Sequence, residues 1–369
     1  MYAASMPTHC ELIPRLDPDT EVEVLQLTST PLLHETVAPA AAAFTQDSTH
    51  LLYSRRFAPD LPPQYWLADL QQGQLRLLLD EAGVQAPALS PDGRYLYYLK
   101  ASGRPGLWRL CLGSLQQEQV VATRFPLASC GCGAVRHDGA AFAVCGQVSD
   151  DLWAIVRFDL VHREAEVILQ SPALAQASVE YAPQSSPDLL ICPAGGDRTF
   201  SAGYGPGLQV IADDGTNLRQ VPLGNSDLSL PRGSCHWAGK DRLATAVLHR
   251  DTPDEAFADD RLVTLALEGE DLRVMAQGRH FGGFDVSRDG RWWVAVEAPT
   301  ADLWIGSVRT GRAELLVQTH ACVGVPRCTN PSPLFSPDAR YVAFHSNCTG
   351  VPQVYAARVE EGLLRSLEK

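Results

Sequence analysis

The feature that most constrains this chain is a sequence pattern that recurs seven times. Each copy has a polar turn followed by a short alternating apolar strand, as in LSPDGRYLYYL from Leu89 and FSPDARYVAF from Phe335. Periods of about 45 to 50 residues are typical of the blades of a β-propeller. The copies are marked by the turn positions Asp47, Asp92, Asp138, Gln184, Lys240, Asp289 and Asp338, which are separated by 45, 46, 46, 56, 49 and 49 residues.

The segments between these turns have the character of strands. DLWIGSVRTGRAELLV from Asp302 alternates with the period of two that a β-strand requires, and no segment carries a sustained apolar stripe at helical spacing. Short strands at regular spacing predict an all-β fold, and seven blade-length repeats favour a seven-bladed β-propeller over the alternative of two unrelated all-β domains. Residues 21–28 (EVEVLQLT) resemble the outer strands of the repeats. We therefore expect this N-terminal strand to complete the last blade and close the ring.

The repeats account for almost the whole chain, so a single domain is expected. The predicted division is an N-terminal lead-in at residues 1–20, the propeller at 21–362 and a C-terminal tail at 363–369. A closed ring of this kind needs no partner for its stability.

Composition excludes several classes of function. The chain has 30 Lys and Arg against 43 Asp and Glu, a formal charge of −13, which disfavours a general binder of nucleic acid or anionic membranes. The N-terminus lacks the pattern of a signal peptide and no stretch is long and apolar enough to span a membrane, so a cytoplasmic location is expected. The ten cysteines have no regular spacing and, in a reducing compartment, are predicted to be free thiols.

A more specific signal comes from longer stretches spread along the chain. They are FTQD at 44–47, DDGTNLRQV at 213–221, SCHW at 234–237 and PSPLFSPDARYVAF near the C-terminus. On these stretches the chain resembles the oligogalacturonide lyases, polysaccharide lyases with a TolB-like seven-bladed propeller. The resemblance implies a carbon–oxygen lyase that cleaves short unsaturated uronic-acid chains by β-elimination. In that family a divalent metal, manganese, offsets the carboxylate charge while a histidine removes the proton.

The resemblance also places candidate site residues. His236, in SCHW, falls where the family has its catalytic base; the alternative is a histidine packed under a loop and bonded to backbone. His280 lies near the position of one metal histidine, and His34 precedes FTQD by about the same distance as a family histidine. We expect both of them to contact substrate.

The remaining metal positions depart from the family. Aligning PSPLFSPD places Arg327, Asn330 and Ser332 where three further ligands would be. An arginine offers no lone pair to a cation, and Asn and Ser are poor ligands for a transition metal. The family metal is therefore not expected here. Gly207 stands at the position of the catalytic arginine, for which Arg198 or Arg232 are possible substitutes.

Two functional hypotheses follow from these departures. In the first, Arg327 replaces the metal as a bidentate carboxylate clamp, Asn330 contacts the substrate, and His236 carries out the elimination on a short uronic-acid oligosaccharide. In the second, the propeller has lost its chemistry and serves as a scaffold that binds a small acid or a protein.

Overall fold

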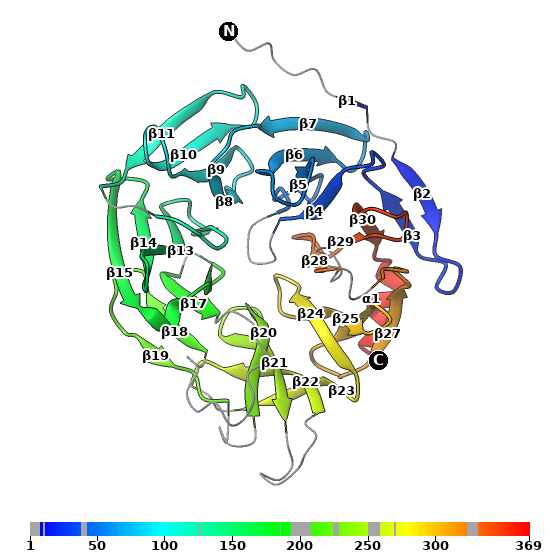
Figure 1. Cartoon of the computed structure of the whole chain (residues 1–369). Coiled ribbons are helices and arrows are strands. Elements are labelled where there is room, and N and C mark those ends of the chain that lie inside the picture. Colours follow the sequence, from blue (N-terminus) through cyan, green and yellow to red (C-terminus); the bar gives the residue numbers. More distant parts are fainter. Residues whose placement is uncertain are drawn as a thin grey trace.

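The computed structural model describes residues 8–9, 12–37, 43–124, 127–184, 186–192, 208–223, 229–249, 259–268, 271–322 and 331–369. Seven antiparallel sheets are arranged as blades around a central axis (Figure 1). The sequence prediction of a seven-bladed β-propeller is confirmed.

The blades follow one another along the chain, and each begins with its innermost strand. Blade 1 contains β4 (Leu33–Thr36), β5 (His50–Arg56), β6 (Gln64–Asp69) and β7 (Gln74–Leu79). Blade 2 contains β8 (Val84–Leu89), β9 (Tyr95–Lys100), β10 (Gly106–Cys111) and β11 (Gln117–Ala122). Blade 3 contains β12 (Ala134–Val135), β13 (Ala141–Ser149), β14 (Leu152–Asp159) and β15 (Glu164–Ser171), followed by a 3-10 turn (Pro172–Leu174).

The second half of the ring repeats this order. Blade 4 contains β16 (Ser178–Tyr181), β17 (Asp188–Cys192), β18 (Gln209–Ala212) and β19 (Arg219–Gln220). Blade 5 contains β20 (Ser229–Trp237), β21 (Arg242–His249), β22 (Asp259–Ala266) and β23 (Arg273–Gln277). Blade 6 contains β24 (His280–Val286), β25 (Trp292–Ala298), β26 (Asp302–Ser307) and β27 (Ala313–Val317). Blade 7 contains β28 (Leu334–Phe335), β29 (Tyr341–Ser346) and β30 (Gln353–Arg358).

Blade 7 is completed from the other end of the chain. Strand β3 (Glu23–Gln26) pairs with β30, with Val24 opposite Ala357, so the expected closure by residues 21–28 is confirmed. Two earlier strands add to the blades as well: β2 (Ile13–Leu16) extends blade 7 beyond β3, and β1 (Thr8–His9) extends blade 1 beyond β7. Pairing the two ends of the chain in one sheet closes the ring, because the last blade then needs no strand from elsewhere.

The chain ends in a short helix, α1 (Glu361–Leu367), which the sequence did not predict. Its residue Leu367 is buried, and Leu363 and Leu364 pack against the apolar cluster shared by blades 6 and 7. A helix of seven residues is too short to show a convincing apolar period. None of the helices in the described part of the chain has the length and apolar character that a membrane crossing needs.

The recurring turn has a common structural cause. In blade 6 the Ser287 hydroxyl donates to Asp289 Oδ1 at 2.6 Å, and Asp289 Oδ1 also accepts the Arg291 backbone N–H at 3.1 Å. The same arrangement holds Ser336 with Asp338 in blade 7. Short polar side chains stabilise tight turns by bonding to backbone two residues away, which explains why the repeat is readable in the sequence.

Apolar side chains of neighbouring blades pack together, as in the cluster shared by blades 6 and 7, and they also pack within a blade. Trp293 on β25 is fully buried, and it occupies the space that a side chain at position 306 would need. An ideal Cβ on Gly306 would lie 2.3 Å from Trp293 Cζ2. The packing of the Trp293 indole therefore requires a glycine at position 306.

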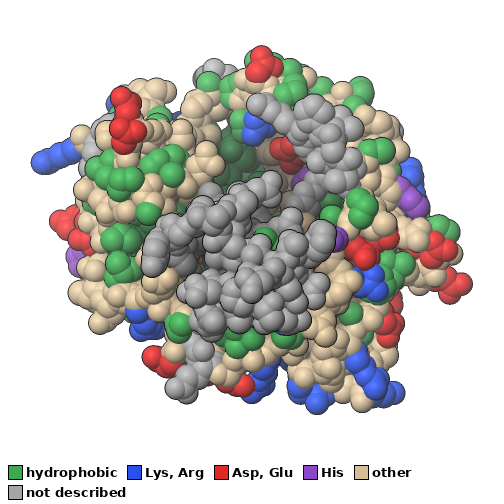
Figure 2. Space-filling model, turned by 60° about the horizontal axis from the view of Figure 1, so that its bottom comes forward, with side chains coloured by type: hydrophobic (Ala, Val, Ile, Leu, Met, Phe, Trp, Pro, Cys, Tyr) green, Lys and Arg blue, Asp and Glu red, His purple; other side chains and the backbone are tan. Residues whose placement is uncertain are grey.

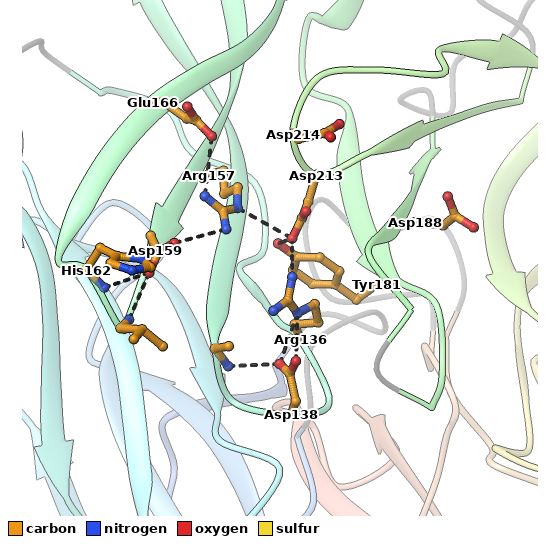
Figure 3. A network of polar contacts seen from close by, with 12 residues as sticks. Arg136, Asp138, Arg157, Asp159, His162, Glu166, Tyr181, Asp188, Asp213 and Asp214 are labelled. Carbon is orange, nitrogen blue, oxygen red and sulfur yellow. Dashed lines mark hydrogen bonds and ion pairs between the residues drawn. The ribbon is translucent and has the colours of Figure 1, made fainter.

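A polar network joins blades 3 and 4 (Figure 3). Asp213, which is buried, accepts a hydrogen bond from Arg136 Nη1 at 2.8 Å and another from the Tyr181 hydroxyl at 3.3 Å, while Arg157 Nε lies 3.5 Å away. Tyr181 is the last residue of the innermost strand of blade 4. The network therefore fixes the strand that carries Glu180, whose role is described below.

A disulfide between Cys192 and Cys235 joins blades 4 and 5, with the two Cα atoms 5.7 Å apart. The prediction that all ten cysteines are free thiols is therefore wrong for this pair. The two residues are separated by 43 positions in the sequence, and only the packing of β17 against β20 brings them together. The free thiols in the described residues are Cys111, Cys130, Cys132, Cys145, Cys322 and Cys348.

Candidate functional site

Each of the seven blades has one residue at an equivalent position of the repeat. This position lies four residues before each repeat turn, and we call the seven residues the ring layer. Four of them are small or apolar and buried, and three consecutive blades carry ionisable groups instead. The ring layer consists of Ala43, Ala88, Ala134, Glu180, His236, Asp285 and Leu334.

The three ionisable residues of the ring layer contact one another. Nδ1 of His236 lies 3.3 Å from Glu180 Oε2 and 3.7 Å from Asp285 Oδ1. The His236 side chain is only 4% exposed, and its Nε2 atom is buried without a hydrogen-bond partner among the described residues. Because the two nitrogens lie on opposite sides of the imidazole ring, Nε2 faces away from both carboxylates.

Contacts with blade 4 hold three consecutive residues of β20. Cys235 forms the disulfide to Cys192, His236 contacts Glu180, and Trp237 Nε1 donates to the backbone oxygen of Glu180 at 3.1 Å. From blade 6, the ring of Phe284 packs edge-on against the His236 imidazole, with centroids 5.1 Å apart. These contacts leave the imidazole little freedom to turn.

Asp285 is fixed from the opposite side. Its Oδ2 accepts the backbone N–H of Phe335 at 2.7 Å, and its Oδ1 faces His236. A chain of polar contacts thus passes from Glu180 in blade 4 through His236 and Asp285 to Phe335 in blade 7.

The charges of this cluster depend on one another. Burial disfavours the imidazolium, but the carboxylates of Glu180 and Asp285 outweigh burial and raise the pKa of His236 above its ordinary value. Burial raises the pKa of Asp285 to about 6, and the nearby Glu180 carboxylate adds to this rise while His236 opposes it. Perturbed groups of this kind gather at functional sites, although structural ion pairs produce them too.

The two carboxylates line a cavity at the end of the channel where the repeat turns lie, which we call the turn end. The cavity has a volume of about 230 Å³, and its walls include Glu180, Asp285 and Trp237. Arg288 also lines it and donates to Gln46 Oε1 at 2.6 Å, which links blade 6 to blade 1. A cavity of this size accommodates water or a small ligand.

His280 does not join the cluster around His236. It is the first residue of β24, five residues before Asp285, which places it about 15 Å along the strand at the usual rise per residue. Its side chain is 71% exposed, and Nδ1 lies 2.9 Å from the buried Asp260 Oδ2. The structure therefore separates two residues that the sequence placed in one site.

His34 lies on β4, nine residues before Ala43 in the sequence. It is 1% exposed, its Nε2 lies 3.3 Å from Thr30 Oγ1, and its ring packs against Tyr53. Burial and the neighbouring Arg55 lower the pKa of His34 to about 4. His34 is thus a neutral histidine packed between strands, and it has no open face toward a ligand in this structure.

Several candidate residues cannot be placed. Arg327, Asn330, Arg198 and Gly207 lie outside the described residues, and the side chain of Arg232 does as well. Ser332 is described and follows Pro331, whose carbonyl accepts the His345 N–H. The proposed carboxylate clamp at position 327 and the contact at position 330 therefore remain predictions.

The residues that the resemblance assigns to manganese do not fit a metal site. Position 327 is an arginine, which offers no lone pair to a cation, and positions 330 and 332 are Asn and Ser, which are poor ligands for a transition metal. Within the described ranges, no three His, Cys, Asp or Glu side chains come close enough together to hold a metal ion. We therefore derive no step through a metal.

Sequence reasoning missed Glu180 and Asp285. Their signal is present in the repeats, because aligning the seven turns puts a charged residue at a position that is Ala or Leu in four other copies. A carboxylate at a position that is otherwise small or apolar indicates a partner nearby, and here the partner is the histidine in the intervening blade.

The fold and the ring layer define a seven-bladed propeller with a polar cluster in its channel, and solved structures of this class include two lyases. An oligogalacturonate lyase from Vibrio parahaemolyticus superimposes with a TM-score of 0.80 at 20% identity, covering 98% of this chain and 100% of that one. An oligogalacturonate lyase in complex with manganese gives 0.78 at 21% identity, with the same coverage.

Curated relatives bear the same name. An oligogalacturonide lyase from Pectobacterium atrosepticum is 24% identical over 94% of this chain and 96% of its own length, and an oligogalacturonate lyase from Dickeya dadantii is 22% identical with the same coverage. No protein-family model matches the chain. The resemblance to oligogalacturonide lyases that the longer sequence stretches indicate is confirmed, and it extends over nearly the whole chain.

Proposed function

We propose that this propeller acts on short unsaturated oligogalacturonides by β-elimination, with His236 as the base. One observation supports this most directly: a buried imidazole faces carboxylates with Nδ1 and keeps Nε2 without a partner among the described residues. A histidine held at one ring nitrogen with the other one free has the arrangement of a general base.

The chemistry assigns one task to each group. Nε2 of His236 removes the proton from the carbon beside the uronate carboxylate. The electrons of that C–H bond form the new double bond of the ring as the bond to the 4-linked sugar oxygen breaks, and the leaving oxygen takes a proton from the imidazolium or from water. Negative charge gathers on the carboxylate side of the substrate during this step, so a cation has to oppose it. Arg327 is the proposed cation, with Asn330 as a further substrate contact.

Charge sets the length of the substrate. The chain carries −13 overall, and Figure 2 shows acidic and basic side chains interspersed around the rim of one end of the molecule. A long polyuronate would be repelled by the net field, whereas a short chain needs only a few cationic groups. His280 and His34 remain proposed substrate contacts. The His280 side chain is exposed, whereas His34, like His236, is buried.

The test is a turnover assay with unsaturated digalacturonate. The purified protein is incubated with this substrate, with and without manganese, and the absorbance of the unsaturated group is followed with products identified by mass. The proposal predicts turnover without added metal, since the donor set does not fit one. Lack of product under both conditions would refute the lyase activity, and turnover that appears only with manganese would refute the metal-free site.

A second function is favoured by one specific observation, the separation of His236 from His280 by about a strand length. If the two cannot act on one substrate, the propeller is a catalytically inactive module that binds a small acid or a protein partner, as the second hypothesis states. Calorimetric titration with digalacturonate would then show binding with no product. Binding with turnover would exclude this alternative.

A cytoplasmic location remains part of the proposal, and cell fractionation tests it. The cytoplasm keeps most protein thiols reduced, so the Cys192–Cys235 disulfide does not favour this location. Recovery of the chain from the cytoplasmic fraction fits the proposal, and recovery from a secreted fraction would contradict it.

A further inference from the structure

We propose that Glu180 and Asp285 are positioning residues, which hold the proton of His236 on Nδ1 and so reserve Nε2 as the atom that accepts the substrate proton. The catalytic part of this inference rests on the proposed function, whereas the position of the proton does not.

Contacts on three strands carry the inference. Nδ1 of His236 lies within ion-pair distance of a carboxylate from β16 on one side and a carboxylate from β24 on the other. Glu180 Oε2 is buried and has no hydrogen-bond partner among the described residues, and an ionised carboxylate can only accept, so a proton on the facing Nδ1 is the arrangement that its charge favours. In the neutral ring the other nitrogen, Nε2, then has a free lone pair.

The position of these residues in the ring shows that the arrangement is specific to three blades. The equivalent ring-layer residues in the other blades are Ala43, Ala88, Ala134 and Leu334, which have no charge to offer. Removing the Glu180 and Asp285 carboxylates from water costs free energy unless a cation offsets their charge. We therefore expect the two carboxylates to act on His236 rather than to stabilise the fold.

Each carboxylate is itself held in place. Asp285 accepts the Phe335 backbone N–H, and the strand of Glu180 is fixed by the Trp237 indole and by the Tyr181–Asp213 contact. Second partners that orient a functional histidine in this way typically change activity by about 10- to 100-fold when they are mutated.

The carboxylates also set the basicity of the ring. Around His236 the charged groups that face the imidazole are Glu180 from β16 and Asp285 from β24, and together they raise its pKa against the effect of burial. A base with a raised pKa binds the transferred proton more strongly once it is neutral. Replacing either carboxylate should therefore move the acidic limb of the pH–activity profile to lower pH.

The decisive experiment measures which ring nitrogen of His236 carries the proton. Long-range proton–nitrogen NMR spectra of the full chain, recorded as a pH series that extends to where the imidazole is neutral, distinguish the two tautomers of each histidine. The His236 signals are identified by their loss in His236→Gln. The variants are Glu180→Gln, Asp285→Asn and the double substitution, all close to isosteric, and the control is Asp260→Asn, which removes the partner of His280 instead.

The inference predicts a pure Nδ1–H tautomer in the wild type, a mixture in the double variant, and unchanged His236 signals in Asp260→Asn. An Nε2–H tautomer in the wild type, or an Nδ1–H tautomer that survives in the double variant, would overturn it. If the tautomer changes as predicted but no form of the protein turns over digalacturonate, the proposed function fails while the positioning role stands.

Discussion

Replacing Asp285 with Asn should make the protein more stable at neutral and alkaline pH. The pKa of Asp285 is raised by burial to about 6, whereas a free Asp side chain titrates near 3.8. The folded state therefore binds this proton more tightly than the unfolded state, so the stability contributed by this group falls as the pH rises from about 4 to about 6. A difference of about 2 pKa units corresponds to about 3 kcal/mol of unfolding free energy lost above that range.

His236 changes the size of this effect but not its sign. Its pKa is raised as well, so its contribution to stability is complete below about pH 6.5 and is lost as the pH rises through the folded value. The Asp285→Asn substitution would remove the cost of ionising the carboxyl, keep an acceptor for the Phe335 N–H, and leave His236 with Glu180 alone. We therefore expect a net gain of about 1–3 kcal/mol at about pH 8, which shrinks toward zero near pH 4.

Thermal unfolding measures this gain. A chain of 369 residues has an unfolding entropy of about 0.8 kcal/mol per kelvin, so the variant should melt about 1–4 °C above the wild type at about pH 8. Asp302→Asn, a half-buried position at the start of β26 in the same blade, serves as the control and should show no such trend with pH. A melting temperature for Asp285→Asn that falls below the wild type at about pH 8, or a gain that is equal at all pH values, would refute the reasoning.

Two further predictions concern the disulfide and the packing of the core. In the chain-entropy treatment, the Cys192–Cys235 disulfide, which closes a loop of 43 residues, stabilises the fold by about 4 kcal/mol, so a reductant should lower Tm by about 5 °C. A peptide map made without reduction should recover the linked pair of peptides, and recovery of both cysteines as alkylated thiols would contradict the disulfide. Gly306→Ala should lower the free energy of unfolding in urea by about 1–3 kcal/mol, because the new Cβ meets the buried Trp293 ring. Gly362→Ala, with open space around it, should be neutral or stabilising, and equal effects of the two substitutions would contradict the packing.

The fold could be predicted because its signals are local. The Ser-x-Asp turns bond to their own backbone within a few residues, and the strands between them alternate with a period of two, so each blade is visible without its neighbours. The closing strand was also readable, since residues 21–28 have the same pattern as the other outer strands.

The site was harder to predict because its contacts cross between blades. His236 was singled out by resemblance, but Glu180 is 56 residues before it and Asp285 49 residues after it, and only the ring brings the three together. His280 was also assigned to the site by resemblance, yet it begins β24, five residues before Asp285, and its side chain contacts Asp260 rather than His236. The position of a residue along its strand determines which residues of other blades it contacts, and a sequence motif alone does not give that position.

The central claim, that Nε2 of His236 takes the substrate proton, is tested most directly by comparing the wild type with His236→Gln on unsaturated digalacturonate. General-base catalysis by a positioned histidine contributes about 100- to 10,000-fold, so kcat/KM should fall by that factor while the calorimetric Kd changes little. His162→Gln, at an exposed turn in blade 3, should match the wild type. Turnover by His236→Gln within about a factor of three of the wild type would contradict the account.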